Sequence, residues 1–455
     1  MTAPATPEAE PTTPEAEPAT PEAEPRLRIL HVVDNYPPVP GGMERAVQAL
    51  ARGQAERGYD VRVVALANPE LPVDALDGQV RVRRLEGYTR FLRRFSNDPD
   101  HQFHPTIPDP QLVRRLEQLI REEPADVIHA HGWIVHSCMA MTRPAGAVLV
   151  HTLHDYGLTC ATKTMIRNQT PGPACPGPSP GRCLPCGAKF YGPAKGVALT
   201  TGTLLGRRRA GVFATGERFG DIDLFLPISE SVARACLADV DPARIRVVPS
   251  FVPDDVVPAA GERPDFLPAG DFLLFVGQLG PHKGIGTLLD AHRRMDTAVP
   301  LVLIGSTRPD TPELTGTDER PVQVFSGLDH DTIMRCFSAA SVAVVPSEWA
   351  EPFGLVAVEA MAVGTPVVAS DVGGLAEVVV DGGTGTLVAA GRPDVLASAL
   401  DTMLADPEGR ARLGAEGRRR ASEFTAAAVI PSVLDGYAAA ARLRPGYVRS
   451  TSPAA

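Results

Sequence analysis

The sequence predicts an α/β protein of two Rossmann-like domains whose parallel sheets face a central cleft. Short apolar runs alternate with helix-forming stretches through residues 27–250 and again through residues 271–423. Strict alternation of this kind is typical of parallel, doubly wound sheets. Between the two series, residues 251–270 are rich in proline and lack apolar periodicity, which indicates an interdomain linker. A chain of 455 residues is also too long for one ordinary core and suits two domains.

The N-terminal tail precedes both domains. Residues 5–25 repeat a seven-residue unit, Ala-Thr-Pro-Glu-Ala-Glu-Pro, three times, with Thr12 replacing the first alanine once. Each unit contains two prolines and no large apolar residue, so neither a coiled coil nor a packed core is expected. We therefore expect residues 1–26 to form a disordered tail.

Turn and cap residues separate the expected elements of the N-terminal domain. A first helix ends near Gly58, and another begins at Asp109-Pro110, with aspartate as the cap and proline at the first helical position. Strands are expected at residues 27–33, 61–66, 127–129, 147–153, 222–226 and 245–248. Because strands and helices alternate through residues 27–250, we expect these residues to form one domain.

The C-terminal domain repeats the pattern. Strands are expected at residues 272–276, 301–304, 322–325, 342–345, 367–369 and 386–388. A last helix is expected within residues 424–445. In such folds, ligands bind at the carboxyl ends of the strands, so the two domains should share one site.

Composition excludes some classes of partner. The net charge is -10, and the acidic tail accounts for about half of it, which argues against nucleic acid as a partner. No apolar run reaches the length of a membrane-spanning helix, and the N-terminus lacks the pattern of a secretory signal. We expect a cytoplasmic enzyme. Peripheral membrane contact stays open because residues 207–209 are all arginine, although a solvated helix face is the simpler interpretation.

The strongest motif lies after the strand at 342–345. The loop 348–351 carries Glu351, and a helix is expected from Pro352 to Val363. The N–H groups of Phe353, Gly354 and Leu355 would then point out of the positive end of this helix, which is a ready phosphate site. Glu351 beside that end suits sugar hydroxyls.

A second motif, residues 275–284, runs from a strand through a glycine-punctuated loop to a helix. Lys283 would stand at the carboxyl edge of the sheet, where an ammonium group can neutralise a diphosphate. Taken alone, this is an ordinary surface lysine before a helix. Beside the glutamate motif, it favours a nucleotide-sugar site.

Together, these segments resemble the retaining glycosyltransferases of family 4, which have the GT-B fold. Glu351 and Glu359, with seven residues between them, match the family's glutamate pair, whose first member contacts the donor sugar and whose second contacts the ribose. Lys283 matches the family's phosphate-binding lysine. Two positions depart from the family: Gln278 replaces the usual arginine of the phosphate loop, and residues 250–251, Ser-Phe, replace its usual Asn-Gly turn.

The resemblance extends to the N-terminal domain, and it implies that the last helix, within residues 424–445, crosses back to that domain. Gly41-Gly42 match the glycine pair before the first helix, which lies against donor phosphate or acceptor. His131 in the phrase Asp-Val-Ile-His-Ala-His-Gly inherits contact with the donor sugar. The pair His154-Asp155 ends the strand at 147–153, and we expect it at the acceptor.

The cysteines form two groups. Cys138, Cys236 and Cys336 fall in helical patterns and suit buried packing. The other four lie in a segment rich in proline and glycine and are separated from one another by 14, 7 and 2 residues. This spacing predicts a structural metal site that holds zinc or an iron–sulfur cluster. The alternative is four free thiols. These four are Cys160, Cys175, Cys183 and Cys186. Some members of the family carry a similar cysteine-bearing insertion.

The resulting prediction is a retaining glycosyltransferase. It would move a hexose-type sugar from a UDP- or GDP-sugar to a small-molecule, cyclitol or glycan acceptor. Catalysis should need no divalent cation, because no Asp-x-Asp metal motif lies at a suitable strand end. Two alternatives remain: a sugar-nucleotide epimerase of the same architecture, and a non-catalytic sugar-nucleotide-binding partner subunit.

Overall fold

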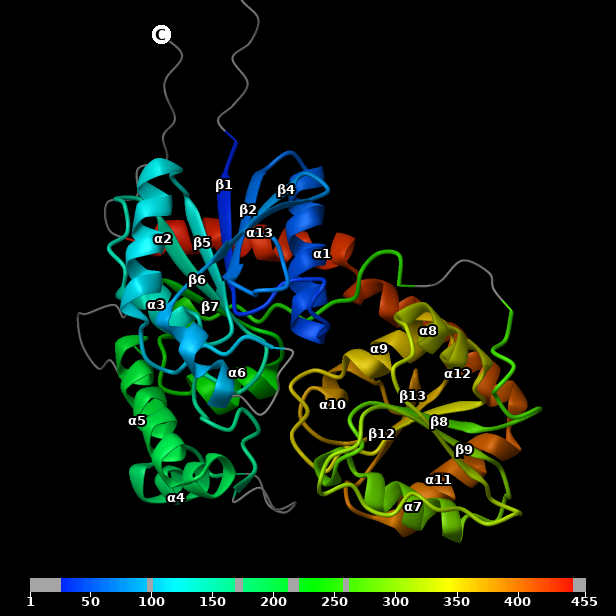
Figure 1. Cartoon of the computed structure of the whole chain (residues 1–455). Helices are drawn as coiled ribbons and strands as arrows, with labels where there is room; N and C mark the ends of the chain where they lie inside the picture. The colour runs from blue at the N-terminus through cyan, green and yellow to red at the C-terminus, as the bar shows by residue number, and fades with distance from the viewer. Residues whose placement is uncertain (1–25, 96–100, 168–174, 212–220, 257–261, 445–455) are drawn as a thin grey trace, which may run out of the picture.

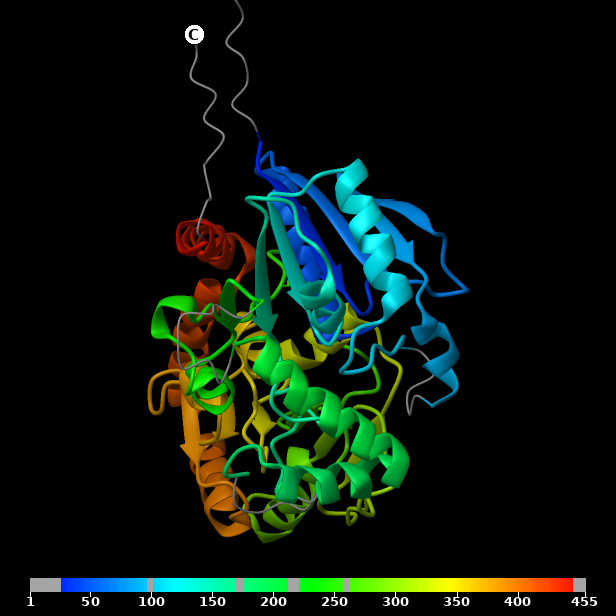
Figure 2. The ribbon, with the colours of Figure 1, turned by 90° about the vertical axis from the view of Figure 1, so that its left-hand side faces the viewer.

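The computed structural model describes residues 26–95, 101–167, 175–211, 221–256 and 262–444 (Figure 1). The repeat tail, part of the cysteine segment and part of the linker lie outside them. The described chain forms two α/β units. The N-terminal unit lies at the left of Figure 1 and the C-terminal unit at the lower right, and Figure 2 shows the same ribbon from its left-hand side. Each unit is built on its own sheet, as the sequence predicts.

The N-terminal sheet has seven strands in the order β3-β4-β2-β1-β5-β6-β7. All neighbours are parallel except β3 and β4. The strands are β1 (Arg28–Val33), β2 (Asp60–Leu66), β3 (Asp74–Asp77), β4 (Val80–Leu85), β5 (Val127–His131), β6 (Val148–Leu153) and β7 (Leu224–Pro227). The helices are α1 (Gly42–Glu56), α2 (Pro110–Glu122), α3 (Val135–Ala140), α4 (Pro180–Tyr191), α5 (Pro193–Arg209) and α6 (Glu230–Leu237), with 3-10 turns η1 (Tyr88–Phe95) and η3 (Pro242–Arg244).

The C-terminal sheet has six parallel strands in the order β10-β9-β8-β11-β12-β13, which is the Rossmann order. They are β8 (Leu273–Val276), β9 (Leu301–Ile304), β10 (Val322–Phe325), β11 (Val342–Val345), β12 (Val367–Ser370) and β13 (Gly385–Val388). The helices are α7 (Ile285–Arg294), α8 (His330–Ala339), α9 (Leu355–Ala362), α10 (Leu375–Val378), α11 (Pro393–Ala405), α12 (Pro407–Ala421) and α13 (Ala426–Leu443), with 3-10 turns η4 (Pro281–Lys283) and η5 (Ser422–Phe424).

Helix α13 belongs in space to the N-terminal domain. It lies across the back of the N-terminal sheet in Figure 1 and packs with α1, β6 and β7. Its buried residues Val429, Ile430, Val433 and Tyr437 share one apolar cluster with α1 and with the buried face of the sheet. A second cluster runs through both domains and includes Tyr156 and Phe353. The two domains are therefore joined by packing as well as by the linker.

Three expectations about elements need correction. Residues 245–248 form no strand: Ile245 makes one isolated bridge to Phe225, and residues 246–250 have no regular secondary structure. The pair β3–β4 was not predicted. Cys183 and Cys186 lie on α4, where a loop was expected. Helix α2 begins at Pro110 as predicted, and Asp109 accepts hydrogen bonds from the first two free N–H groups.

The arginine cluster and the search for membrane helices bear on membrane contact. Within the described residues, no helix combines the length and apolar character that crossing a bilayer requires. Arg207 is buried and donates to Thr159 Oγ1 and to the carbonyl of Cys236. Arg209 is paired with Asp221 at 2.6 Å. Residues 207–209 therefore do not form the continuous exposed basic patch that their sequence suggests.

Candidate active site

The start of α9 lies at the carboxyl edge of the C-terminal sheet, directly after β11. The helix begins at Leu355, and Gly354 is its cap with φ of 109°. Pro352 is therefore outside the helix, and the free N–H groups of its first turn belong to Leu355 and Val356 instead of Phe353. Phe353 is buried in the interdomain cluster. A glycine is required at 354, because a Cβ there would lie 2.5 Å from Leu375 Cδ2.

Glu351 and Lys283 form a tight ion pair beside this helix start. Lys283 Nζ donates to both carboxylate oxygens of Glu351, at 2.8 and 2.9 Å. Ser347 Oγ and Trp349 Nε1 donate to the same carboxylate at 3.0 and 2.8 Å. Burial alone would raise the pKa of Glu351, but Lys283 and these hydrogen bonds hold the pKa below its ordinary value. Glu351 is therefore an oriented, ionised carboxylate.

The backbone around Lys283 explains how it reaches Glu351. The short turn η4 ends at Lys283, and Gly284 follows with φ of 75°. A Cβ on Gly284 would lie 1.8 Å from the carbonyl oxygen of Pro346, so only glycine allows the two strand ends to approach this closely. The phosphate-loop motif and the glutamate motif are thus pressed together at one edge of the sheet.

Arg308 lies beside these motifs, paired with Asp310 at 3.0 Å, and was not among the predicted site residues. It follows β9, and its Nη1 donates to Gln278 Oε1 at 3.0 Å. Burial, Lys283 and Arg308 together lower the pKa of His282 to about 4, with burial the largest cause. The only signal in the sequence was an arginine shortly after a strand end. Gln278, where the resembling family has arginine, thus lies beside a guanidinium supplied by a neighbouring loop.

Glu359 lies inside α9 and contacts the other domain. Its Oε1 accepts from Arg45 Nη2 of α1 at 3.2 Å, and His330 Nε2 lies 3.9 Å away. Burial raises the pKa of Glu359, and Arg45 opposes this shift. In this structure, therefore, the carboxylate expected at a ribose is occupied by a side chain of the N-terminal domain.

The glycine pair lies opposite the start of α9. Gly41 caps α1, and Gly42 is its first residue. A Cβ on Gly42 would lie 3.7 Å from Leu355 Cδ1, so the two helix starts face each other across the domain boundary. A Cβ on Gly41 would clash with the buried carboxylate of Glu44. Both glycines therefore keep this end of α1 free of bulk.

Several hydrogen bonds cross the boundary around the loop before α9. Tyr156 Oη donates to the carbonyl of Ala350 at 2.9 Å, and Ser229 Oγ donates to the carbonyl of Pro352 at 2.7 Å. Glu377 accepts the first two N–H groups of α6, from Glu230 and Ser231, both at 2.8 Å. The loop carrying Glu351 is thus held by both domains.

Three histidines lie together on one face of the N-terminal sheet. His31 and His129 are register partners in β1 and β5, and His131 lies two residues further along β5, on the same face. All three are buried. Their nitrogens are close enough to hold a metal ion, yet each already has a hydrogen-bond partner. His129 contacts Tyr437 Oη at 2.8 Å and Thr152 Oγ1 at 2.7 Å, as expected of a packing residue.

The remaining contacts form a chain. His154 Nε2 lies 3.0 Å from His131 Nδ1, and His131 Nε2 lies 3.0 Å from His31 Nδ1. His31 Nε2 then contacts Gln54 Oε1 at 2.8 Å, and Gln54 Nε2 donates to Tyr437 Oη at 3.0 Å. Both ring nitrogens of His131 are therefore engaged by other histidines, and the partly exposed His154 ends the chain.

Asp155 follows His154 at the rim of the N-terminal domain. Its Oδ1 accepts from the N–H of Gly157 at 2.7 Å, and its Oδ2 lies 3.7 Å from Lys163 Nζ. It is partly exposed. The four cysteines gather further along the same segment, beyond this rim.

Two family models match the chain. The model for Glycosyltransferase Family 4 matches residues 40–256, and that for Glycosyl transferases group 1 matches residues 265–420. A D-inositol 3-phosphate glycosyltransferase of Frankia alni is 30% identical over 428 residues, which are 87% of this chain and 94% of that protein. An alpha-maltose-1-phosphate synthase of Mycolicibacterium smegmatis is 35% identical over 224 residues, 44% of this chain and 57% of that protein.

Solved structures agree on the fold. Sucrose-phosphate synthase from Thermosynechococcus elongatus gives a TM-score of 0.66 at 22% identity and covers 90% of this chain and 98% of that one. Anabaena Alr3699/HepE in complex with UDP and glucose gives 0.62 at 19% identity, over 91% of this chain and 100% of that one. The chain therefore belongs to glycosyltransferase family 4 and is a glycosyltransferase with the GT-B fold.

Proposed function

We propose that this protein transfers a hexose-type sugar from a UDP- or GDP-sugar to an acceptor hydroxyl, with retention of anomeric configuration. The observation that carries this proposal is the partly buried ion pair of Lys283 and Glu351 at the start of α9. A lysine and free helical N–H groups suit a diphosphate, and an ionised carboxylate beside them suits sugar hydroxyls. Arg308 adds a second cation on the same side.

The same geometry favours front-face attack. Glu351 accepts four hydrogen bonds, two from Lys283 and one each from Ser347 and Trp349 of its own loop. A carboxylate held in this way is a poor nucleophile, so we expect it to orient the sugar. The acceptor oxygen would bond to the anomeric carbon as the bond to the diphosphate breaks, and the leaving phosphate would take the hydroxyl proton. The protein's contribution is positioning and stabilisation of charge.

The acceptor is expected at the rim formed by His154 and Asp155. Both are partly exposed, and Asp155 can accept from a hydroxyl group. The chain's relatives include proteins named as D-inositol 3-phosphate glycosyltransferase and alpha-maltose-1-phosphate synthase. Cyclitol phosphates and sugar phosphates therefore belong in the acceptor panel, together with glycans and natural-product aglycones.

Donor hydrolysis by the purified full chain tests the proposal. The panel should contain UDP- and GDP-hexoses, each with and without EDTA. We expect one donor to be consumed at a rate that EDTA leaves unchanged and that Glu351→Ala lowers on the order of 100-fold, a barrier increase of about 2.7 kcal/mol. The exposed Glu408 of α12 offers the matched control, Glu408→Ala, which should keep the parent rate.

Product analysis separates the alternatives. Proton NMR of the glycosylated product should show the anomeric configuration of the donor. An isomerised nucleotide sugar with no transfer would identify an epimerase. Tight donor binding without hydrolysis or transfer across the acceptor panel would instead favour a non-catalytic binding subunit.

A further inference from the structure

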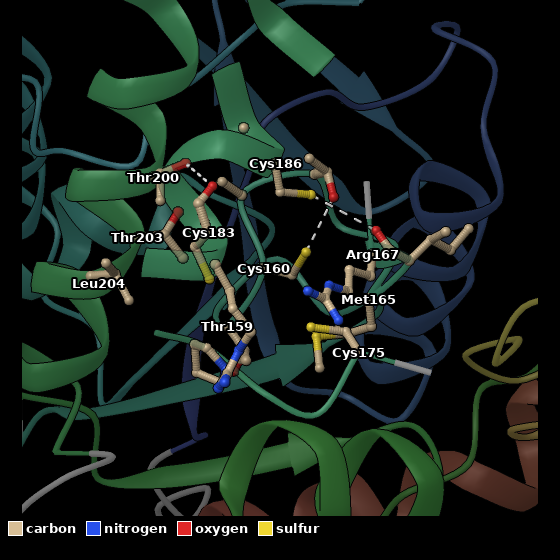
Figure 3. A pocket seen from close by; sticks show the side chains of 16 residues that line it. Thr159, Cys160, Met165, Arg167, Cys175, Cys183, Cys186, Thr200, Thr203 and Leu204 are labelled. Carbon is tan, nitrogen blue, oxygen red and sulfur yellow. Dashed lines mark hydrogen bonds between the residues drawn. The ribbon is translucent and has the colours of Figure 1, made fainter. Parts of the chain in front are cut away.

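Four of the seven cysteines surround one hollow in the N-terminal domain (Figure 3). We call it the cysteine pocket; the cysteines that line it are Cys160, Cys175, Cys183 and Cys186. They come from three places in the chain: the turn after β6, the segment before α4, and α4 itself. The other three cysteines are buried singly in α3, α6 and α8. Four thiols gathered around one hollow are therefore a separate feature of this chain.

Backbone hydrogen bonds hold this arrangement. The N–H of Cys175 donates to the carbonyl of Met165 at 3.1 Å, which ties the second cysteine to the loop after the first. Cys183 and Cys186 lie three residues apart on α4, so their side chains share a helix face. The N–H of Ser179 donates to Cys183 Sγ at 3.3 Å. Such a bond stabilises negative charge on sulfur, as a metal-bound thiolate needs.

The thiols are free, and their sulfurs turn toward neighbouring polar atoms. Cys160 Sγ lies 3.2 Å from Thr162 Oγ1, and Cys186 Sγ lies 3.9 Å from the carbonyl of Ile166. Within the described residues, no three of these sulfurs lie within 4.8 Å of one another. Sulfurs around one zinc ion lie about 3.8 Å apart, given a Zn–S distance of about 2.3 Å. Side-chain rotation must therefore bring the sulfurs together when an ion binds.

Backbone strain in the loop after Cys160 is a further reason to expect a bound metal ion there. Lys163 and Met165 adopt positive φ values of 63° and 54°, which cost non-glycine residues on the order of 1–3 kcal/mol each. Cys160 and Met165 are partly buried at the margin of the large cluster, and the small cluster beside them has only Trp133, Ala161 and Leu199 as buried members. Metal–thiolate bonds would offset the backbone strain of this loop.

We propose that the cysteine pocket binds one Zn²⁺ ion through the thiolates of its four cysteines. The ion is structural, because four protein ligands leave no open coordination position. All four of its ligands follow His154-Asp155, two of them before α4 and two on α4, so the ion fixes the segment beside the rim. This site is separate from donor chemistry, and its test does not depend on the proposed function.

Metal analysis of the full chain, expressed with zinc and purified without chelator, is the test. We expect about one zinc per chain, lost in Cys183→Ser/Cys186→Ser and retained in Cys336→Ala, the control from the C-terminal domain. Added Co²⁺ should give the absorption of tetrahedral thiolate coordination. If the double variant does not fold, the zinc content of Cys175→Ser and that of the parent protein still test the proposal. Iron with sulfide, disulfides in the mass spectrum, or four titratable thiols without metal would each overturn the zinc site.

The histidine chain carries a second, independent inference. Gln54 Oε1 can only accept, so His31 Nε2 carries the proton. Burial lowers the pKa of His31 and of His154 to about 4 and that of His131 well below its ordinary value, so all three rings are neutral near pH 7. A neutral ring has one N–H. His131 Nε2 must then donate to His31 Nδ1, and His154 Nε2 must donate to His131 Nδ1.

We infer that Gln54 and Tyr437 are positioning residues that set the tautomer of His154, leaving its Nδ1 unprotonated to accept from an acceptor hydroxyl. Tyr437 contributes because Gln54 Nε2 donates to its hydroxyl, which keeps the amide in this orientation. The inference rests on the proposed function for the identity of the hydroxyl, but the tautomers themselves do not. Tyr437 of α13 would thus be connected to His154, on the acceptor side, by four consecutive hydrogen bonds.

Nitrogen-15 NMR of the histidine rings tests this directly in the full chain. His131 and His154 should be Nε2–H tautomers in the parent and in the control Tyr59→Phe. Tyr437→Phe and Gln54→Leu should shift both rings toward mixed tautomers and lower kcat about tenfold with little change in donor KM. Nδ1–H tautomers in the parent, or unchanged tautomers in both variants, would overturn the inference. Correct tautomers without any transfer would instead count against the proposed function.

Discussion

Arg308 shows how one residue can supply a charge that a motif lacks. Gln278 is exposed and neutral, but it accepts from Arg308, whose guanidinium lies on the same side as Lys283. A guanidinium binds phosphate oxygens with two parallel hydrogen bonds, whereas an amide contributes one weaker donor. The charge expected at position 278 is therefore present at the loop after β9.

We predict that Arg308→Gln raises the donor KM about tenfold, equal to about 1.4 kcal/mol, and changes kcat little, because the lost contact acts on bound donor. The double variant Gln278→Arg/Arg308→Gln, which moves the positive charge to the loop after β8, should recover most of the affinity for the donor. Steady-state kinetics measures both. Arg293→Gln, which removes an exposed arginine of α7, is the control. An unchanged KM in Arg308→Gln would show that this guanidinium does not contact the donor.

At the scale of single elements, the start of α9 decides how the N–H groups are presented. Gly354 is left-handed, and its missing Cβ makes room for Leu375 of α10. Gly354→Ala should therefore destabilise the protein by about 1–3 kcal/mol and weaken donor binding, because the first turn of α9 must shift. Thermal unfolding and donor titration are the measurements.

A second glycine provides the matched control for that change. Gly286 lies in α7, and a Cβ added there meets no atom within 4 Å. Gly286→Ala should be neutral or stabilise the protein by about 0.5–1 kcal/mol, since alanine favours helix. Equal effects of the two substitutions would mean that position 354 tolerates a side chain and that its conformation is not required.

These elements also mark how far the sequence could predict the site. Alternation of strands and helices predicted both sheets, since apolar strands in a parallel sheet are recognisable locally. The first residue of α9 was placed three positions early, because proline suits a helix start but the packing of Gly354 against α10 overrides it. The Arg308–Gln278 and Arg45–Glu359 contacts join loops and domains distant in sequence, so no local pattern could indicate them.

The strands near the edges of the N-terminal sheet illustrate the same limit: β4 lies next to the edge strand β3, and residues 245–248 lie beside the edge strand β7. In β4, Val80 and Val82 are buried while Arg81 faces outward, so the strand carries alternating rather than continuous apolar residues. It is nevertheless paired with β2 along its length. The expected strand at 245–248 has similar apolar content, yet only two backbone hydrogen bonds tie it to the neighbouring β7, from Arg246 and Val248. Apolar content alone does not distinguish these cases, because pairing depends on where the chain goes next.

At the scale of the whole molecule, Glu377 fastens one domain to the other. Its carboxylate accepts the free N–H groups at the start of α6, the most favourable place on a helix for a negative charge. We predict that Glu377→Ala costs about 1–3 kcal/mol and separates the unfolding of the two domains in calorimetry. Glu408→Ala should leave a single transition at the parent temperature. A single, unshifted transition in Glu377→Ala would show that packing alone joins the domains.

The buried histidines make the stability of the whole protein depend on pH. Burial lowers the pKa of His31, His104 and His151 to about 4, whereas an unfolded histidine titrates near 6.5. Above pH 6.5, both states are neutral and stability is at its full value. As the pH falls from about 6.5 toward 4, the unfolded chain binds protons that the folded protein cannot, so stability is lost across this window.

The magnitude follows from the shifts. At pH 5, each of these histidines costs about 2 kcal/mol, at about 1.4 kcal/mol per pH unit below 6.5. Asp34 opposes them, because burial raises its pKa to about 6 and the folded state then holds a proton that the unfolded state releases. The net loss is therefore several kcal/mol, a large part of a typical free energy of unfolding.

Urea unfolding at pH 7.5, 6 and 5 measures this loss. His104 provides the decisive variant, because it lies outside the histidine chain and its ring nitrogens contact Ser137 Oγ and the carbonyl of Pro105. His104→Gln should lower the free energy of unfolding at pH 7.5. It should also make the decline between pH 6.5 and 5 less steep, because unfolding then takes up about one proton fewer, since glutamine cannot titrate. A decline that begins only below pH 4.5, or one that His104→Gln leaves equally steep, would assign the acid sensitivity to carboxylates such as Asp126, whose pKa is lowered in the folded state.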